Sequence, residues 1–224
     1  MSDIKVANPN HKIANPAHNL ASPELTGVEV HGITRSSFIL RGALAAGAVY
    51  GTSAVAPFVS QALAEGGGGD AAILNFALTL EYLESAFYEV KGRQVGLSGQ
   101  AKAYAKQFGA EEGEHVVALT AAIKQLGGAP VKKPTFVFPP TDEKSFLALA
   151  SVLENTGVGA YNGAAPSIKS KQVLASAGSI VQIEARHAAA IDLLIGKSPT
   201  PNQGFDKPLT EKQVLAAAGP LIKS

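Results

Sequence analysis

Apolar residues recur every three or four positions in four long segments of the chain, which is the spacing of helices that bury one face. The pattern predicts helices over residues 70–92, 98–128, 141–164 and 171–195. Asp70, Ser98 and Asp142 begin three of these segments and are residue types that cap helix N-termini. Gly92 and Gly127 are expected to end the first and second helices, because glycine is common just beyond a helix C-terminus.

The connections between the predicted helices are short, long and short. Residues 129–140 form the long connection and contain four prolines, so this stretch cannot be helical throughout. Two antiparallel hairpins joined by one crossover satisfy these lengths. The sequence therefore predicts an all-α four-helix bundle over residues 65–195. A short helical pattern at residues 209–218 predicts that the tail, residues 196–224, packs on the bundle.

The two predicted hairpins carry the same polar residues at the same offsets. The first helix reads LEYLESAFY from Leu80 and the third reads LENTGVGAY from Leu153, so each has a tyrosine seven residues after a glutamate. The second helix reads EGEH from Glu112 and the fourth reads EARH from Glu184. This internal repeat indicates one functional unit assembled from two hairpins.

Each Glu-x-x-His pair places a carboxylate and an imidazole on one helix face, since positions i and i+3 are neighbours. Carboxylate oxygen and imidazole nitrogen suit iron or manganese. Four carboxylates also match the charge of two divalent ions, which offsets the cost of burying them. The alternative is solvated surface pairs, but the only histidines after the leader are the two in this motif. The sequence predicts a site for two iron or manganese ions, with the ligands Glu81, Glu112, His115, Glu154, Glu184 and His187.

These motifs resemble the ferritin-like superfamily, and within it the exported bacterial ferritin-like domain proteins related to desiccation-associated proteins. The resemblance covers about residues 68–195. It implies a ferritin-like bundle in which Tyr88 and Tyr161 form hydrogen bonds to ligand carboxylates, as a second layer around the metal site. Buried tyrosines with otherwise satisfied hydroxyl groups are the alternative for this pair.

Three further glutamates neighbour the proposed ligands in sequence. Glu111 and Glu114 are expected to face solvent or the edge of the bundle. Glu84 lies one turn after Glu81, but its counterpart in the third helix is Gly157. We therefore interpret Glu84 as a surface residue rather than an additional carboxylate of the site.

Residues 1–64 resemble a leader that directs export. The sequence TRSSF resembles a twin-arginine signal with Ser36 in place of the second arginine, and an Ala-x-Ala cleavage site follows at residues 62–64. Recognition by the export machinery and a periplasmic location are the expectation. The alternative is a retained anchor, because the 21 uncharged residues from 42 to 62 are long enough to span a bilayer.

Composition narrows the classes of function. The chain has no cysteine, so thiolate zinc sites, iron–sulfur clusters and disulfides are excluded, and a metal must bind through oxygen and nitrogen. Its 19 basic and 18 acidic side chains are interspersed. Without a basic stripe, nucleic acid is not an expected partner.

Two functions of different classes fit the predicted site. The first is redox chemistry with O2 or H2O2 as the small-molecule substrate, in the manner of a ferroxidase, a peroxidase or a catalase. The second is a structural role in an exported stress or desiccation-associated protein, whose metal ions mainly stabilise the bundle. Iron storage in a cage is less favoured, because the leader and the tail would have to be accommodated. The sequence leaves homo-oligomerisation open.

Overall fold

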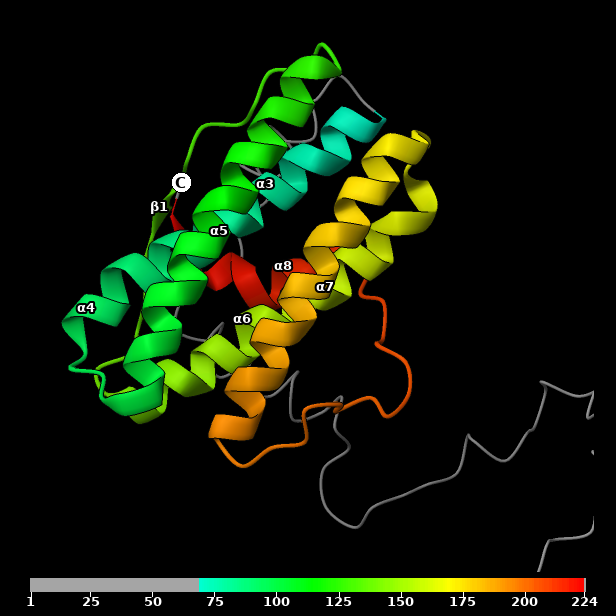
Figure 1. The fold of residues 1–224 in the computed structure, drawn as a ribbon. Helices are drawn as coiled ribbons and strands as arrows, with labels where there is room; N and C mark the ends of the chain where they lie inside the picture. The colour runs from blue at the N-terminus through cyan, green and yellow to red at the C-terminus, as the bar shows by residue number, and fades with distance from the viewer. Residues whose placement is uncertain (1–68, 224) are drawn as a thin grey trace, which may run out of the picture. The chain divides into compact units, whose positions relative to one another are not determined.

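Residues 69–223 are the part of the chain that the computed structural model describes. Four long helices dominate this part: α3 (Asp70–Ala86), α5 (Gly99–Gln125), α6 (Glu143–Ala164) and α7 (Lys171–Leu194). α3 packs chiefly against α5 and α6 chiefly against α7, so two helical hairpins lie side by side (Figure 1). The predicted four-helix bundle with a long crossover is confirmed. The predicted leader and its cleavage site lie outside the described residues.

The first helix continues past Gly92, its predicted end. It passes from α3 into a π-helical turn, η2 (Phe87–Lys91), and then into α4 (Gly92–Gln94). Gly92 has helical backbone angles, and a Cβ placed there would lie 3.3 Å from the Cβ of Ala105. Its role is therefore to let the helix approach α5 closely. The left-handed residue that follows this helix is Gly96, with φ of 65°.

Asp70 is the first residue of α3 rather than its predicted N-cap, a position that Gly69 occupies. Its carboxylate accepts hydrogen bonds from the backbone N–H groups of Lys169 (2.8 Å) and Ser170 (2.7 Å), immediately before α7. These hydrogen bonds hold the pKa of Asp70 below its usual value. Asp70 thus ties the start of the first hairpin to the turn inside the second.

Side-chain and strand hydrogen bonds hold the long crossover against the bundle. Asn75, fully buried in α3, donates to the carbonyl of Ala129 (2.9 Å) and accepts from the N–H of Val131 (2.7 Å). Further along, β1 (Thr135–Phe136) pairs antiparallel with β2 (Ile222–Lys223) from the end of the chain. The crossover is therefore attached both to the first helix and to the C-terminal segment.

The segment between α7 and the next helix, residues 196–210, is here called the strap. Leu209 of the strap donates its backbone N–H to the carbonyl of Gly159 in α6 (2.8 Å). A Cβ at Gly163 would lie 1.9 Å from the Leu209 carbonyl oxygen. Only glycine at this position lets the strap backbone lie directly on α6.

Short elements complete the described chain. The turn between α6 and α7 contains η3 (Ala165–Ser167), and the strap leads to α8 (Glu211–Ala218) and η4 (Gly219–Leu221). α8 packs on α6 and buries Val214 almost completely. Within the described residues, no helix is both long and apolar enough to cross a membrane.

Two apolar clusters fill the bundle and leave a polar layer between them. One cluster contains Phe87, Phe146 and Ile191, and the other contains Leu78 and Ile123. Along α5 and along α7, residues of the first cluster and residues of the second lie on opposite sides of the Glu-x-x-His pair. Burial of the apolar side chains stabilises the bundle by roughly 25 cal/mol for each Å² removed from water. The polar layer is thereby sealed at both ends.

Gly163→Ala is expected to displace the strap, because the added Cβ would overlap the Leu209 carbonyl. We expect the free energy of unfolding to fall by about 1–3 kcal/mol, as in other overpacked sites, and the strap to become sensitive to protease. Urea denaturation and limited proteolysis measure the two effects.

Gly178→Ala on α7 is the matched control, since a Cβ there meets nothing within 4 Å. It should leave stability unchanged or raise it by up to about 1 kcal/mol, because alanine is the better helix former. If Gly163→Ala behaves like this control, the strap does not lie on α6.

Candidate metal centre

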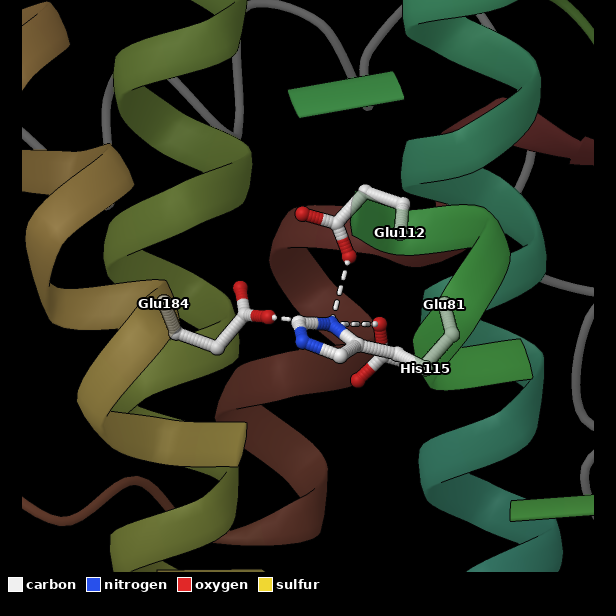
Figure 2. Close-up of side chains that lie close together, drawn as sticks. All are labelled: Glu81, Glu112, His115 and Glu184. Carbon is white, nitrogen blue, oxygen red and sulfur yellow. Dashed lines mark hydrogen bonds and ion pairs between the residues drawn. The ribbon is translucent and has the colours of Figure 1, made fainter. Parts of the chain in front are cut away.

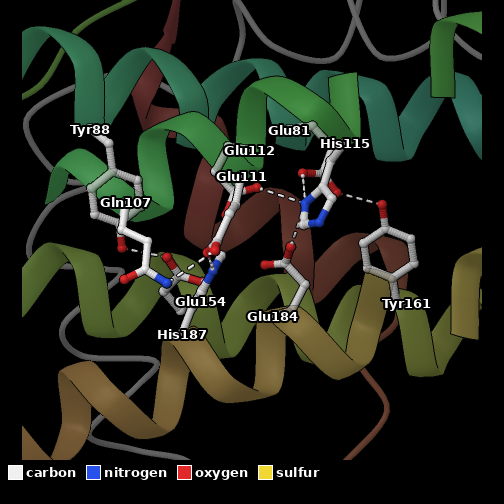
Figure 3. Close-up of polar contacts among 10 residues, drawn as sticks. All are labelled: Glu81, Tyr88, Gln107, Glu111, Glu112, His115, Glu154, Tyr161, Glu184 and His187. Carbon is white, nitrogen blue, oxygen red and sulfur yellow. Dashed lines mark hydrogen bonds and ion pairs between the residues drawn. The ribbon is translucent and has the colours of Figure 1, made fainter. Parts of the chain in front are cut away.

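The six residues predicted as ligands come together in the polar layer of the bundle. α3 and α6 each supply one glutamate, and α5 and α7 each supply one Glu-x-x-His pair (Figure 3). None of the six is more than 9% exposed, and three of the glutamates have no exposed area. The residues of this group are Glu81, Glu112, His115, Glu154, Glu184 and His187.

One half of the group is centred on His115. Its Nδ1 lies 3.1 Å from Glu81 Oε2, 3.1 Å from Glu112 Oε2 and 3.1 Å from Glu184 Oε1 (Figure 2). These three carboxylates belong to three different helices. Three carboxylate oxygens therefore surround one nitrogen atom. The same set of oxygen and nitrogen atoms would suit a metal cation bound among them.

The other half of the group is centred on His187. Its Nδ1 lies 2.9 Å from Glu112 Oε1 and 3.4 Å from Glu154 Oε2. Glu112 and Glu184 belong to both halves, and in each half the four candidate donor atoms lie within 4.8 Å of one another. Two carboxylates shared between two sets of donors is the arrangement expected where carboxylates bridge a pair of ions.

Five buried side-chain atoms of this layer, all of a kind that can bind a metal ion, make no hydrogen bond of good geometry. They are Glu112 Oε1, Glu154 Oε2, both carboxylate oxygens of Glu184, and His187 Nδ1. Buried polar atoms are seldom left unpaired, and each one costs about 1–3 kcal/mol. All five belong to the predicted ligands. Four of these atoms have only an ion-pair contact within the group, between a histidine Nδ1 and a glutamate oxygen. The fifth, Glu184 Oε2, has no partner among the described residues. The residues present therefore fit a metal centre, since metal ions would bind atoms that otherwise contact only one another.

The two tyrosines form hydrogen bonds that cross between the hairpins. Tyr88, from the first hairpin, donates its hydroxyl to Glu154 Oε1 of the second. Tyr161, from the second hairpin, donates to Glu81 Oε1 of the first. Each bond occupies one carboxylate oxygen and leaves the other facing the histidines (Figure 3). The tyrosines thus orient the glutamates of α3 and α6.

Glu111, expected at the surface or the edge of the bundle, is 34% exposed and also contacts the site. Its Oε2 lies 2.6 Å from His187 Nε2, and its Oε1 accepts a hydrogen bond from Gln107 (3.0 Å). Phe108 stacks on the imidazole from one side, with ring centroids 4.0 Å apart. The sequence repeat gives no signal for Glu111, because its counterpart in α7 is Ile183.

Glu84 was interpreted from sequence as a surface residue, and this interpretation is wrong. The residue is 3% exposed. The reason is Gly157, its counterpart in α6, which has no side chain to fill the space between the two helices. A Cβ built on Gly157 would lie 3.3 Å from Glu84 Oε1 and 3.0 Å from Glu184 Oε2. Glu84 therefore lies beside the predicted ligands.

The buried charges strongly shift the protonation of the site. Burial alone would lower the pKa of His115, but hydrogen bonds to Glu112, Glu184 and Glu81 raise it to about 12. Burial likewise opposes the charge on His187, and its carboxylate neighbours raise its pKa to about 11. Burial also raises the pKa of Glu81, to about 8. Both imidazoles are cationic at neutral pH, and they supply positive charge among the carboxylates.

A search of curated proteins found no match to this chain. A sequence model of the ferritin-like domain, in contrast, matches residues 69–197. The match begins at the start of α3 and ends just after α7, so it spans the four helices that supply the candidate ligands. It covers more than half of the sequence, and the chain therefore belongs to the ferritin-like domain family.

Proposed function

We propose that the polar layer of the bundle is a dinuclear centre of iron or manganese, and that this centre reacts with O2 or H2O2. The observation that supports it most is a set of five buried oxygen and nitrogen atoms, all on the predicted ligands, that make no hydrogen bond outside the group itself. Four carboxylates and two neutral imidazoles would balance two divalent ions. When bound, such ions supply the redox chemistry with O2 or H2O2 that side chains alone do not provide.

The surrounding residues would prepare this centre in three ways. Tyr88 and Tyr161 hold one oxygen each of Glu154 and Glu81. Glu111 binds the Nε2 of His187 and so directs Nδ1 toward the carboxylates. The apolar clusters at either end exclude bulk water, which strengthens every electrostatic interaction in the layer.

The metal content of the purified protein tests the first part of the proposal. We expect about two iron or manganese ions per chain. Glu154→Gln removes one charge and one donor without changing the shape of the side chain, and it should reduce the content to about one ion or fewer. Elemental analysis after purification from the native host measures both.

Glu114→Gln is the control, because Glu114 is exposed on α5, two residues from Glu112. Wild-type protein with less than one ion per chain would refute the dinuclear centre. Rapid mixing of the ferrous protein with O2 or with H2O2 then tests the reaction. If the iron is oxidised no faster than free ferrous ion, the ions have the structural role expected of a stress or desiccation-associated protein.

Metal binding is expected to strengthen as pH rises. Without metal, the imidazoles of His115 and His187 remain protonated at neutral pH because their pKa values are about 12 and about 11. A histidine must be neutral to bind a metal, so loading should release at least about two protons per chain. Below these pKa values protons compete with the metal, and raising the pH removes the competitor.

Calorimetric titration of the metal-free protein with Mn²⁺, in buffers of different ionisation enthalpy, counts the released protons. His115→Gln should lower the count by about one. A release near zero would mean that neither imidazole binds the ion.

We further propose that residues 1–64 direct export and are removed by cleavage after the Ala-x-Ala motif at residues 62–64. The support is the order of the sequence features, in which a basic segment is followed by an uncharged stretch and an Ala-x-Ala motif. Mass spectrometry of the protein from its native host should find a mature N-terminus at Glu65. An intact Met1 in the mature protein would instead favour a retained anchor.

A further inference from the structure

Glu84 is a buried carboxylate that the six-residue centre does not use. It lies one turn after Glu81 in α3, and the residue is only 3% exposed. Within the described residues, no hydrogen bond or ion pair holds its carboxylate. The charged groups that act on it are other carboxylates, which repel it. A buried acid with no partner needs another stabilising group.

The space for Glu84 comes from a break in the internal repeat. Glu81, Glu112 and His115 of the first hairpin have counterparts in the second, whereas Glu84 is matched by Gly157. A Cβ at Gly157 would be 3.3 Å from Glu84 Oε1 and 3.0 Å from Glu184 Oε2. Any side chain at this position would press on both carboxylates, so the glycine leaves one space that the Glu84 carboxylate reaches.

The level of Glu84 along the bundle places it near the middle of the centre. Tyr88 of η2 contacts Glu154 of α6, and Tyr161 of α6 contacts Glu81 of α3. Along the helix that runs from α3 into η2, Glu84 lies between Glu81 and Tyr88, and hence between these two contacts. Its carboxylate and that of Glu184, which belongs to both halves of the centre, both lie against Gly157.

The electrostatic surroundings agree with this position. Burial raises the pKa of Glu84 well above its usual value, and the charges of Glu184, Glu112, Glu154 and Glu81 raise it further, in that order. Glu184 and Glu112, which belong to both halves of the centre, thus raise the pKa of Glu84 more than Glu154 and Glu81 do. Such a cluster of like charges is costly in the absence of cations.

We propose that Glu84 is a fifth carboxylate ligand of the dinuclear centre, binding beside Glu184 through the space that Gly157 leaves open. The inference rests on the proposed function, because it needs metal ions in the polar layer. It makes the centre asymmetric, since only the first hairpin supplies the extra carboxylate. A fifth negative charge also favours a pair of ions with more total charge than two divalent ions carry.

The test compares Glu84→Gln with wild type by calorimetric titration of the metal-free protein with Mn²⁺. Glutamine keeps the shape of the side chain but loses the charge and is a poorer metal ligand. We expect at least one Mn²⁺ ion to bind roughly tenfold or more weakly. The metal-free variant should melt at a higher temperature than wild type, because a neutral amide costs less to bury beside Glu184 and Glu81 than a carboxyl group does. A purely structural role for Glu84 predicts a lower melting temperature instead.

Two matched variants separate this effect from general damage. Glu114→Gln removes an exposed charge and should leave both Mn²⁺ affinities unchanged. Gly157→Ala alters no proposed ligand, yet its Cβ would press on Glu84 and Glu184. It should weaken Mn²⁺ binding in the same direction as Glu84→Gln, whereas Gly178→Ala, with open space around its Cβ, should not.

A crystal structure of the Mn²⁺-loaded wild type gives the direct readout, with an oxygen of Glu84 expected within bonding distance of an ion. If wild type binds about two ions and Glu84→Gln binds them equally tightly, the role of Glu84 is refuted and the dinuclear centre stands. A wild type that binds no Mn²⁺ and carries no metal from its host overturns both proposals.

Discussion

Repulsion among buried carboxylates is the constraint on which the rest of the structure depends. Glu81, Glu112, Glu154 and Glu184 come from four helices, and none is more than 1% exposed. Like charges repel strongly where water is excluded, so this layer closes only when cations are present. In the metal-free chain these are the imidazolium groups of both histidines, together with protons on the glutamates whose pKa values are raised. Folding of the bundle and the binding of cations are therefore coupled.

Neither hairpin contains a complete site, and this explains why the bundle needs both. Glu112 contacts the histidines of both hairpins, and each tyrosine reaches across to a glutamate of the other one. Separating the hairpins would expose the apolar clusters and also break these crossed contacts. Asp70 also joins the two hairpins, because its carboxylate at the start of α3 binds the turn before α7. The fold thus positions the donors by joining two copies of one motif.

The features that could be predicted from sequence are those that repeat. The helices, their order and the six predicted ligands follow from periodicity and from two copies of one spacing, and the structure brings all six residues together. The features that were missed occur in one copy only. Glu84 is buried because Gly157 is small, and the partner of Glu111 is in another helix. Gly92 looked like a helix end because a glycine that permits close packing reads the same in sequence as one that stops a helix.

The places where the repeat fails also indicate how the two halves of the centre differ. His187 is held by Glu111 at Nε2 and stacked against Phe108. Among the described residues His115 has neither of these contacts, since the counterparts of Glu111 and Phe108 in α7 are Ile183 and Ile180. A histidine fixed at its second nitrogen is a better oriented and more basic donor than one that is not. The two halves of the proposed dinuclear centre would therefore be unequal even without Glu84. Two copies of one motif set the positions of the donors, and substitutions on single hairpins then distinguish one half from the other.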